Sequence, residues 1–277
     1  MSTSPKHWFK KRGYLHFDFP IGPTRAYELI ESPATVARHS FYPLLRCNQN
    51  SVKVSKDPVT GELTKKPKDR PISYAAHKDS AIYSFYGNQL SERYETVIAE
   101  QNLHDSVLAF RSLKKTNIHF AKTAFDTIKA MGNCTAIALD IRQFFQHIDH
   151  QVLKNQWCKL LGVEQLPPDH YAVFKSITRY ASVDREKLYQ LLNISPYNPK
   201  HKRERICSAE QFRHTVRKSG LIETNTSGVG LPQGLTIRGS SSFHMDFRIS
   251  VTGLAIRKII IINVPVLLYP FALALAA

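Results

Sequence analysis

Acidic residues and cysteines are scarce in this sequence, and each shortage excludes a class of protein. The 277 residues include 22 Asp and Glu against 38 Lys and Arg, so the formal net charge is +16 and the pI is about 9.7. The four cysteines form neither a CxxC pair nor a cluster with histidine, which excludes short-spaced zinc sites and argues against a disulfide framework. Low-complexity runs and repeats are absent, whereas 43% of the residues are hydrophobic, so we expect a packed core.

The N-terminus also lacks the apolar segment that follows the positive charges of a signal peptide. We therefore expect the protein in the reducing cytoplasm. The excess of positive charge favours a polyanionic partner, and nucleic acid is the first candidate because its phosphates attract Lys and Arg and release counterions on contact. The alternative is a basic surface that serves solubility.

Apolar spacing predicts mostly helices. Helical periodicity begins at Asp79 and gives way to a strand-like run at 107–110. The stretch 48–68 is basic and rich in turn residues, and we interpret it as a connection between two more apolar segments. Further helices are predicted over residues 121–131, 150–161, 169–180 and 185–192, with Gly132, Asp149 and Gly162 as caps.

One acidic residue stands where chemistry could occur. The run Cys134-Thr-Ala-Ile-Ala-Leu-Asp140 has the length and apolar character of a buried strand that ends in a carboxylate, and Phe145 follows five residues later. This pattern fits a nucleotidyl-transfer site, in which the carboxylate holds Mg²⁺ and the aromatic ring closes the floor beneath the incoming sugar. The same pattern recurs in many α/β proteins, where the acid is structural, so both interpretations stay open at this point.

A second pattern is the glycine-rich string Gly-Val-Gly-Leu-Pro-Gln-Gly at residues 228–234. Three glycines around Pro232 predict a turn that approaches another group closely. Gln233 would then be held where its amide can hydrogen-bond a base or a ribose. The alternative is an ordinary Gly/Pro loop, but the specific order of residues favours a functional one.

Basic residues gather in two segments that could bind nucleic acid, Lys65 to Arg70 and Lys200 to Arg205. Residues 198–218 contain seven Lys and Arg against two Glu. A solvated basic face is the alternative, because Lys and Arg are common on any surface. The candidate residues are Lys65, Lys66, Lys68, Lys200, Lys202, Arg203 and Arg205.

Together these segments resemble reverse transcriptases, and most closely the bacterial ones of retrons, group II introns and abortive-infection and other defence systems. Leu139-Asp-Ile-Arg-Gln-Phe-Phe145 resembles palm motif A, and Gly230-Leu-Pro-Gln-Gly234 resembles motif B in the right order. The stretch 70–83 resembles a fingers motif, and 108–115 resembles the next basic fingers segment. The resemblance covers residues 70–239.

The resemblance implies an RNA-directed DNA polymerase of the antiviral-defence type, with two Mg²⁺ ions, an RNA template, dNTP substrates and a DNA product. A non-coding RNA or a second reverse-transcriptase subunit would be a further partner. Asp140 would bind metal, with the Ile141 carbonyl as a second contact. Phe145 would be the steric gate against a ribose 2′-hydroxyl, and Gln233 would line the nucleotide pocket. Arg70, Arg111 and Lys114 would contact the triphosphate or the template phosphates. Lys115 would bind the nucleic acid beside them.

We therefore expect an α+β chain built as right-hand polymerase fingers and a partial palm, with no thumb or motif C hairpin evident. The N-terminal extension and the start of the fingers would occupy 1–69, the fingers 70–133, and the palm 134–258. Within the palm, motif A lies near 139–145, motif B near 228–239, and a helical insertion at 150–218. An atypical apolar tail follows at 259–277.

The sequence departs from the family after motif B. It contains no Asp-Asp pair for motif C, and the only carboxylate side chain after Gly239 is Asp246. Of the 19 residues 259–277, 16 are apolar and none is charged. Three interpretations of this tail are open: an out-of-frame or truncated end, a buried or partner-covered segment, and a membrane anchor. The tail is close to the roughly 20 residues that a helix needs to span a bilayer core, but its two prolines and Asn263 argue against a membrane anchor, and thus against a membrane as partner.

Two functional alternatives follow from this departure. The chain could be a non-catalytic nucleic-acid-binding relative that acts with a catalytic partner. It could also be a shortened chain with no stable function of its own, in which case exposed apolar strand edges predict aggregation.

Overall fold

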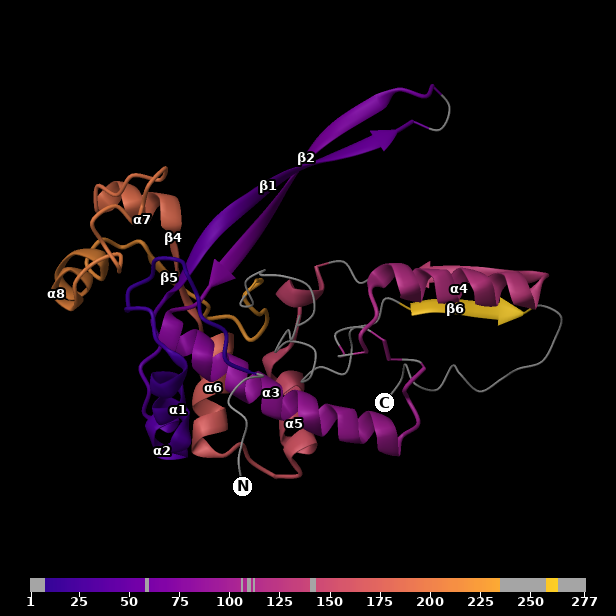
Figure 1. The fold of residues 1–277 in the computed structure, drawn as a ribbon, viewed down its shortest axis with the longest axis horizontal. Coiled ribbons are helices and arrows are strands. Elements are labelled where there is room, and N and C mark those ends of the chain that lie inside the picture. Colours follow the sequence, from indigo (N-terminus) through magenta and orange to yellow (C-terminus); the bar gives the residue numbers. More distant parts are fainter. Residues whose placement is uncertain are drawn as a thin grey trace.

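The computed structural model describes residues 8–57, 60–105, 107–108, 111, 113–139, 143–234 and 258–263. Helices and a mixed four-stranded sheet make up an α+β fold (Figure 1). The helices are α1 (Pro23–Glu31), α2 (Pro33–Ala37), α3 (His77–Glu100), α4 (Asn117–Met131), α5 (His150–Leu161), α6 (Pro168–Thr178), α7 (Arg185–Leu191) and α8 (Ala209–Gln211), with a 3₁₀ turn η1 (Phe144–Gln146) and a π-helical turn η2 (Phe212–Val216). The strands are β1 (Leu44–Lys56), β2 (Leu63–Tyr74), β3 (Cys134–Leu139), β4 (Ala181–Asp184), β5 (Ile222–Thr224) and β6 (Lys258–Asn263).

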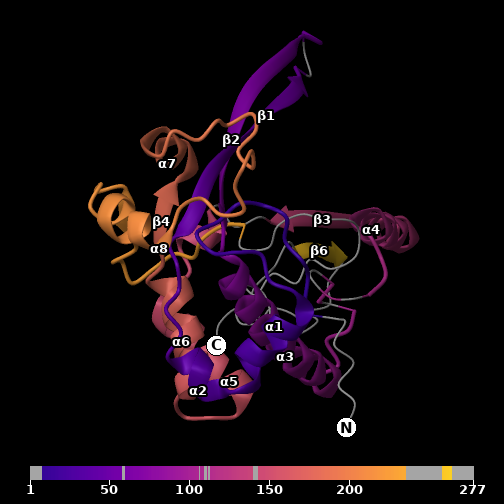
Figure 2. The ribbon, with the colours of Figure 1, turned by 60° about the vertical axis from the view of Figure 1, so that its left-hand side comes forward.

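The most prominent feature is a long β-hairpin that projects from the body of the molecule (Figures 1 and 2). β1 and β2 pair antiparallel along their length, from Leu45 opposite Tyr74 to Lys56 opposite Leu63. The interpretation of 48–68 as a connection is therefore wrong, although the predicted turn is present, because Asp57 N–H donates to the Glu62 carbonyl at the hairpin tip (2.8 Å). The predicted boundary between residues 69 and 70 falls inside β2, so the two predicted segments share one hairpin.

The base of the hairpin joins the mixed sheet, whose strand order is β2-β1-β4-β5. β4 runs parallel to β1, and β5 runs antiparallel to β4. Side chains from this base pack with α7, the 14–17 segment and the 206–216 segment in a hydrophobic core. The region 150–218, predicted as a helical insertion in the palm, contains α5, α6, α7 and α8 and also β4, which pairs with β1 in this sheet.

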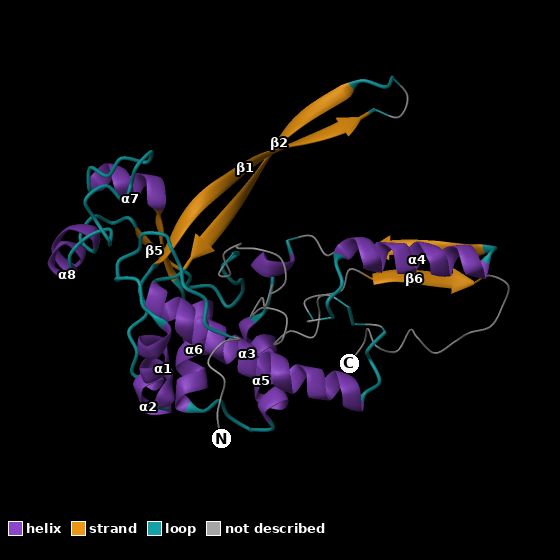
Figure 3. Cartoon of the chain, in the orientation of Figure 1, coloured by secondary structure: helices purple, strands orange, loops and turns teal. Residues whose placement is uncertain are grey.

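A second, smaller sheet pairs β3 with β6 antiparallel, and α4 packs beside it (Figure 3). The predicted strand and the predicted helix before it are confirmed, and Gly132 ends the helix with φ +68°. The described part of the chain does not show the predicted burial of the strand, because Ile137 is 38% exposed where β3 pairs with β6 beside α4. Residues 259–263 of the apolar tail lie in β6, whereas 264–277 lie outside the described residues.

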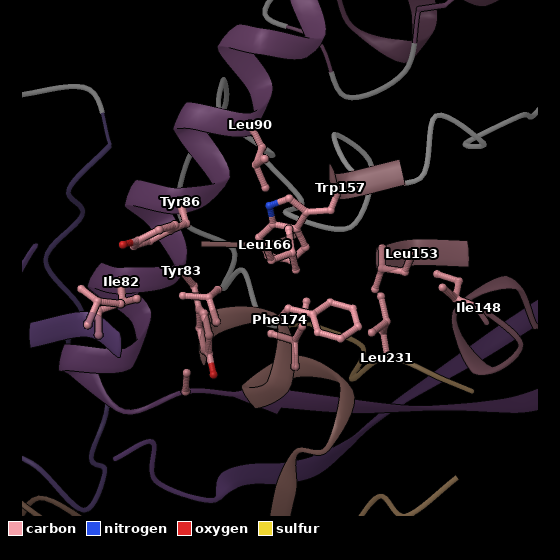
Figure 4. Close-up of a cluster of buried hydrophobic side chains, with 14 of the residues drawn as sticks. Ile82, Tyr83, Tyr86, Leu90, Ile148, Leu153, Trp157, Leu166, Phe174 and Leu231 are labelled. Carbon is pink, nitrogen blue, oxygen red and sulfur yellow. The ribbon is translucent and has the colours of Figure 1, made fainter. Parts of the chain in front are cut away.

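The main core lies among the helices, where α3 packs against α1, α5 and α6, and α2 against α6 (Figure 4). Trp157 is fully buried there and its Nε1 donates to His170 Nδ1 (3.2 Å). Tyr86 donates its hydroxyl to Asp169 Oδ2 (2.6 Å). Buried polar groups in this core are thus hydrogen-bonded, as a low-dielectric interior requires. The predicted helices of this core are confirmed, including the Asp149 and Gly162 caps of α5.

The start of α3 is held by a carboxylate far away in the sequence. Asp18 accepts hydrogen bonds from the backbone N–H groups of His77 and Lys78 (both 2.9 Å) and from His77 Nδ1 (2.7 Å). Burial alone would raise the pKa of Asp18, but these hydrogen bonds together hold it below its ordinary value. This N-terminal cap fixes α3 relative to the end of β2, three residues upstream of the helix.

No helix among the described residues is long and apolar enough to cross a membrane. The strand-like run predicted at 107–110 is not seen at Val107 and Leu108, which lie in irregular structure, while residues 109 and 110 lie outside the described residues.

Candidate functional site

Three segments far apart in the sequence meet beside the main core. The segment 145–150 runs antiparallel to the glycine-rich loop, which we define as residues 228–234. Leu231 N–H donates to the Phe145 carbonyl, and Gly230 N–H donates to the Ile148 carbonyl (both 2.8 Å). The end of β2 closes the arrangement, because Ser73 N–H donates to the Gln233 carbonyl (2.7 Å). The structure thereby brings Phe145 and Gln233 into one site.

Two glycines make this contact possible. Gly234 has φ +92°, and a Cβ at this position would lie 2.4 Å from Ile72 Cγ2 and 3.3 Å from the Ser73 carbonyl oxygen. Gly230 has φ +90°, and its Cβ would lie 3.2 Å from the Gln146 carbonyl oxygen. The predicted close approach of the loop is therefore confirmed, and the groups it approaches are β2 and η1 of the chain itself.

The glycine-rich loop is also anchored in the main core. Leu231 is 5% exposed and lies in the same buried cluster as Ile148 and Leu153 (Figure 4). Phe145 is half-buried against this cluster and meets Phe144 edge to face, with ring centroids 5.2 Å apart. The loop thus has a fixed position relative to the predicted gate residue.

Two further residues lock the loop, and sequence reasoning missed both. His150 Nε2 lies 2.8 Å from the Gly230 carbonyl, which can only accept, so Nε2 donates. Asn225 Nδ2 donates to the carbonyls of Thr178 (2.9 Å) and Val229 (3.1 Å). The only sequence signals were the polar character of these residues and the preference of Asn for turns, neither of which names a partner.

Asp149, an acid that lies beside the glycine-rich loop, has a structural role. One oxygen of its carboxylate accepts from the backbone N–H groups of Gln151 and Val152 (both 2.8 Å), as the predicted N-cap of α5. Asp140 and Ile141, the predicted metal contacts, lie outside the described residues, as does Asp246. Among the described residues, no group of three His, Cys, Asp or Glu could hold a metal ion.

The basic residues of β2 are divided between the two faces of the hairpin. Lys66 and Arg70 are exposed, and the register places them on the face that carries Ile72, next to the glycine-rich loop. Lys65 is exposed on the opposite face, across from Val54. Lys68 pairs with Ser51 in the register, and its side chain lies outside the described part. We call Lys66 and Arg70 the basic stripe.

Arg111 differs from its predicted role. Its side chain is 3% exposed, and its guanidinium pairs with Glu95 (2.8 Å) while also donating to the carbonyls of His104 and Val107. A guanidinium used in this way is a poor candidate for a phosphate contact, because the phosphate would have to break buried hydrogen bonds. Lys114 and Lys115 are exposed, in the turn before α4.

The remaining predicted basic residues lie elsewhere in the molecule. Lys200, Lys202, Arg203 and Arg205 fall between α7 and α8, which lie together beside the base of the hairpin (Figure 1). Lys200 and Lys202 are exposed, and Arg203 and Arg205 are half-buried. The predicted nucleic-acid contacts therefore fall in three places: the hairpin, the turn before α4 that carries Lys115, and the segment between α7 and α8.

Neither a protein-family model nor a curated protein matches this chain.

Proposed function

We propose that this chain is an RNA-directed DNA polymerase of the reverse-transcriptase type, of the kind used in bacterial antiviral defence. The observation that supports the proposal most is the meeting of Phe145, the glycine-rich loop and the end of β2. The resemblance assigns these three segments to palm motif A, palm motif B and the fingers. A shared nucleotide pocket would need them to be adjacent, and nothing in their separate sequences requires it.

The proposed pocket uses each part for one task. Gln233 is fixed through its carbonyl to β2, which sets the position from which its amide would bond a base or ribose. The half-buried Phe145 ring would meet the sugar and exclude a 2′-hydroxyl. The basic stripe would neutralise phosphates of the template or of the incoming dNTP.

The described residues do not form a site that fits two Mg²⁺ ions. Two-metal phosphoryl transfer needs several carboxylates close together. In the described part of the chain no such cluster exists, and the Asp149 carboxylate is used by α5. The catalytic part of the proposal rests on Asp140, which lies outside the described residues.

The exposed basic stripe favours a second candidate, a non-catalytic nucleic-acid-binding relative that works with a catalytic partner. The basic stripe would suffice for it, and Asp140 would have no role in binding. Its affinity for nucleic acid would fall with salt by about 0.7 to 0.9 logarithmic units for each phosphate contact, per tenfold rise in salt.

Primer extension separates the two candidates. The full chain is given a primed RNA template, Mg²⁺ and dNTPs, beside Asp140→Asn and a matched control, Asp126→Asn. Asp126 is an exposed acid on α4 paired with Lys122, so removing its charge should change stability by less than about 0.5 kcal/mol.

The polymerase proposal expects extension by the wild type and by Asp126→Asn, and none by Asp140→Asn at equal folding and RNA binding. Extension that survives in Asp140→Asn would refute the assignment of Asp140. Folded protein that binds RNA without extending any primer would support the non-catalytic candidate.

A further inference from the structure

A second surface, away from the glycine-rich loop, has the character of a binding site. We define the basic loop as residues 195–205, between α7 and α8. It is held at both ends by buried side chains: Ile194 is 5% exposed and Ile206 is 3% exposed. Backbone hydrogen bonds join Ile194 N–H to the Tyr189 carbonyl and Ile206 N–H to the His16 carbonyl (both 2.8 Å). The loop is therefore fixed to the body of the protein at its two ends.

The interior of the basic loop is organised as well. His201 N–H donates to the Asn198 carbonyl, and Arg203 N–H donates to the Lys200 carbonyl (both 3.1 Å), which makes two successive turns. Lys202 lies between them with φ +58°, a left-handed conformation that is uncommon outside glycine. These turns present Lys200 and Lys202 to solvent at defined positions.

The far end of the basic loop carries a stacked guanidinium. Arg205 Cζ lies 4.5 Å from the centroid of the Phe19 ring, and Phe19 is itself 48% exposed. This cation–π contact fixes a positive charge at the surface beside an aromatic ring. Glu204 is the only acidic residue of the loop, against Lys200, Lys202, Arg203 and Arg205.

Tyr197, at the near end of the basic loop, is the most exposed of the large apolar or aromatic side chains in the described part of the chain. Its side chain is 96% exposed, so it contributes almost nothing to the core. Tyr197 lies three residues before Lys200 in the same loop. An exposed aromatic ring that shares a loop with exposed cations suits unpaired nucleic acid, because a base can stack on the ring while the phosphates meet the cations. A base inside a duplex offers no free face for this contact.

We propose that the basic loop binds unpaired nucleic acid, with Tyr197 stacking on a base and Lys200 and Lys202 contacting the flanking phosphates. A membrane surface is the less favoured partner, because Tyr197 stands without the apolar helix face that interfacial binding requires. The inference goes beyond the proposed function, since it uses no residue of the glycine-rich loop or the basic stripe, and its test does not depend on polymerase activity.

The test is fluorescence anisotropy with a labelled oligouridylate, an oligothymidylate and a duplex of equal length. Tyr197→Ala should weaken binding of the single strands by about 5- to 150-fold, the effect of one lost base stack, and leave duplex binding unchanged. Tyr197→Phe keeps the ring and should bind within about twofold of the wild type. Ile118→Ala removes another highly exposed large side chain, on α4, which has no aromatic face for a base, and serves as the control.

Nucleic acid bound to the basic stripe of the hairpin would mask a loss of binding at the basic loop. Each measurement is therefore repeated in a Lys66→Ala/Arg70→Ala background. Lys200→Ala and Lys202→Ala should each lower the salt slope by about one, for single strands and duplex alike. Weaker binding of the oligouridylate alone by Tyr197→Ala would assign the site to RNA. Weaker binding of both single strands would assign it to unpaired strands of either kind. Three results would overturn the proposal. Tyr197→Ala could bind the single strands with wild-type affinity in both backgrounds, or it could lose as much affinity for the duplex as for the single strands. The third result is Tyr197-dependent binding to anionic vesicles in place of oligonucleotides.

Discussion

Replacing Gly234 by alanine tests how the glycine-rich loop is seated on β2. The new methyl group would lie 2.4 Å from Ile72 Cγ2, about 1.5 Å inside ordinary carbon–carbon contact. The backbone at φ +92° would also become strained, since side-chain-bearing residues rarely adopt it. Both effects act on the folded state.

The magnitude follows from these two contributions. Overpacking of a fitted contact costs about 1 to 3 kcal/mol. Strain at a positive φ costs about 1 to 2 kcal/mol. Alanine also restricts the unfolded chain, which offsets about 0.4 to 1 kcal/mol. We therefore expect Gly234→Ala to lower the free energy of unfolding by about 1 to 4.5 kcal/mol.

Urea unfolding measures this loss, and the chain offers a matched control. Gly228 lies in the same loop, has no positive φ, and has no atom within 4 Å of a Cβ built on it, so Gly228→Ala should stay within about 0.5 kcal/mol of the wild type. Trimming Ile72 to alanine removes the clashing methyl, so the Gly234→Ala/Ile72→Ala pair should show a favourable coupling of about 1 to 2 kcal/mol. A Gly234→Ala protein as stable as Gly228→Ala, or zero coupling, would refute the proposed seating.

The other predictions concern acid stability and capping. His16 is fully buried and neutral, with Nδ1 accepting from Phe17 N–H (2.9 Å), and burial lowers its pKa from 6.5 to about 3. The unfolded chain therefore binds one more proton between these values, so this contribution to stability is complete above pH 6.5 and falls by up to about 1.4 kcal/mol per pH unit as the pH drops toward 3. Urea unfolding between pH 7 and 4 should show a shallower loss in His16→Gln, and an unchanged slope would contradict the buried neutral histidine. Asp149→Ala should cost about 0.5 to 2 kcal/mol by uncapping α5, against almost nothing for Asp126→Ala, and equal stability of the two variants would exclude the cap.

Local chemistry made much of the fold predictable. Helix ends could be placed because Asp149, Gly132 and Gly162 have side chains or backbone freedom suited to caps, which depends only on neighbouring residues. The hairpin was not predicted, because β2 carries the adjacent Lys65 and Lys66, one on each face, followed by Pro67, and these residues obscure the alternation of apolar and polar side chains.

The candidate site was predictable in its parts but not in its partners. The three glycines indicated a close approach, yet the groups approached, Ile72 and Gln146, are far away in the sequence. Arg111 illustrates the same limit, because the resemblance implied phosphate binding while its partner Glu95 lies 16 residues earlier, on α3. Long-range packing decides such roles, and a linear pattern does not contain it.

The most direct test of the proposed pocket is nucleotide selection during primer extension on RNA by the wild type and by Phe145→Ala. The account predicts that the wild type incorporates dNTPs and rejects rNTPs, and that Phe145→Ala also accepts rNTPs, because the ring that excludes the 2′-hydroxyl is gone. Incorporation of neither nucleotide by folded protein that binds RNA, or identical selectivity of the two proteins, would contradict it.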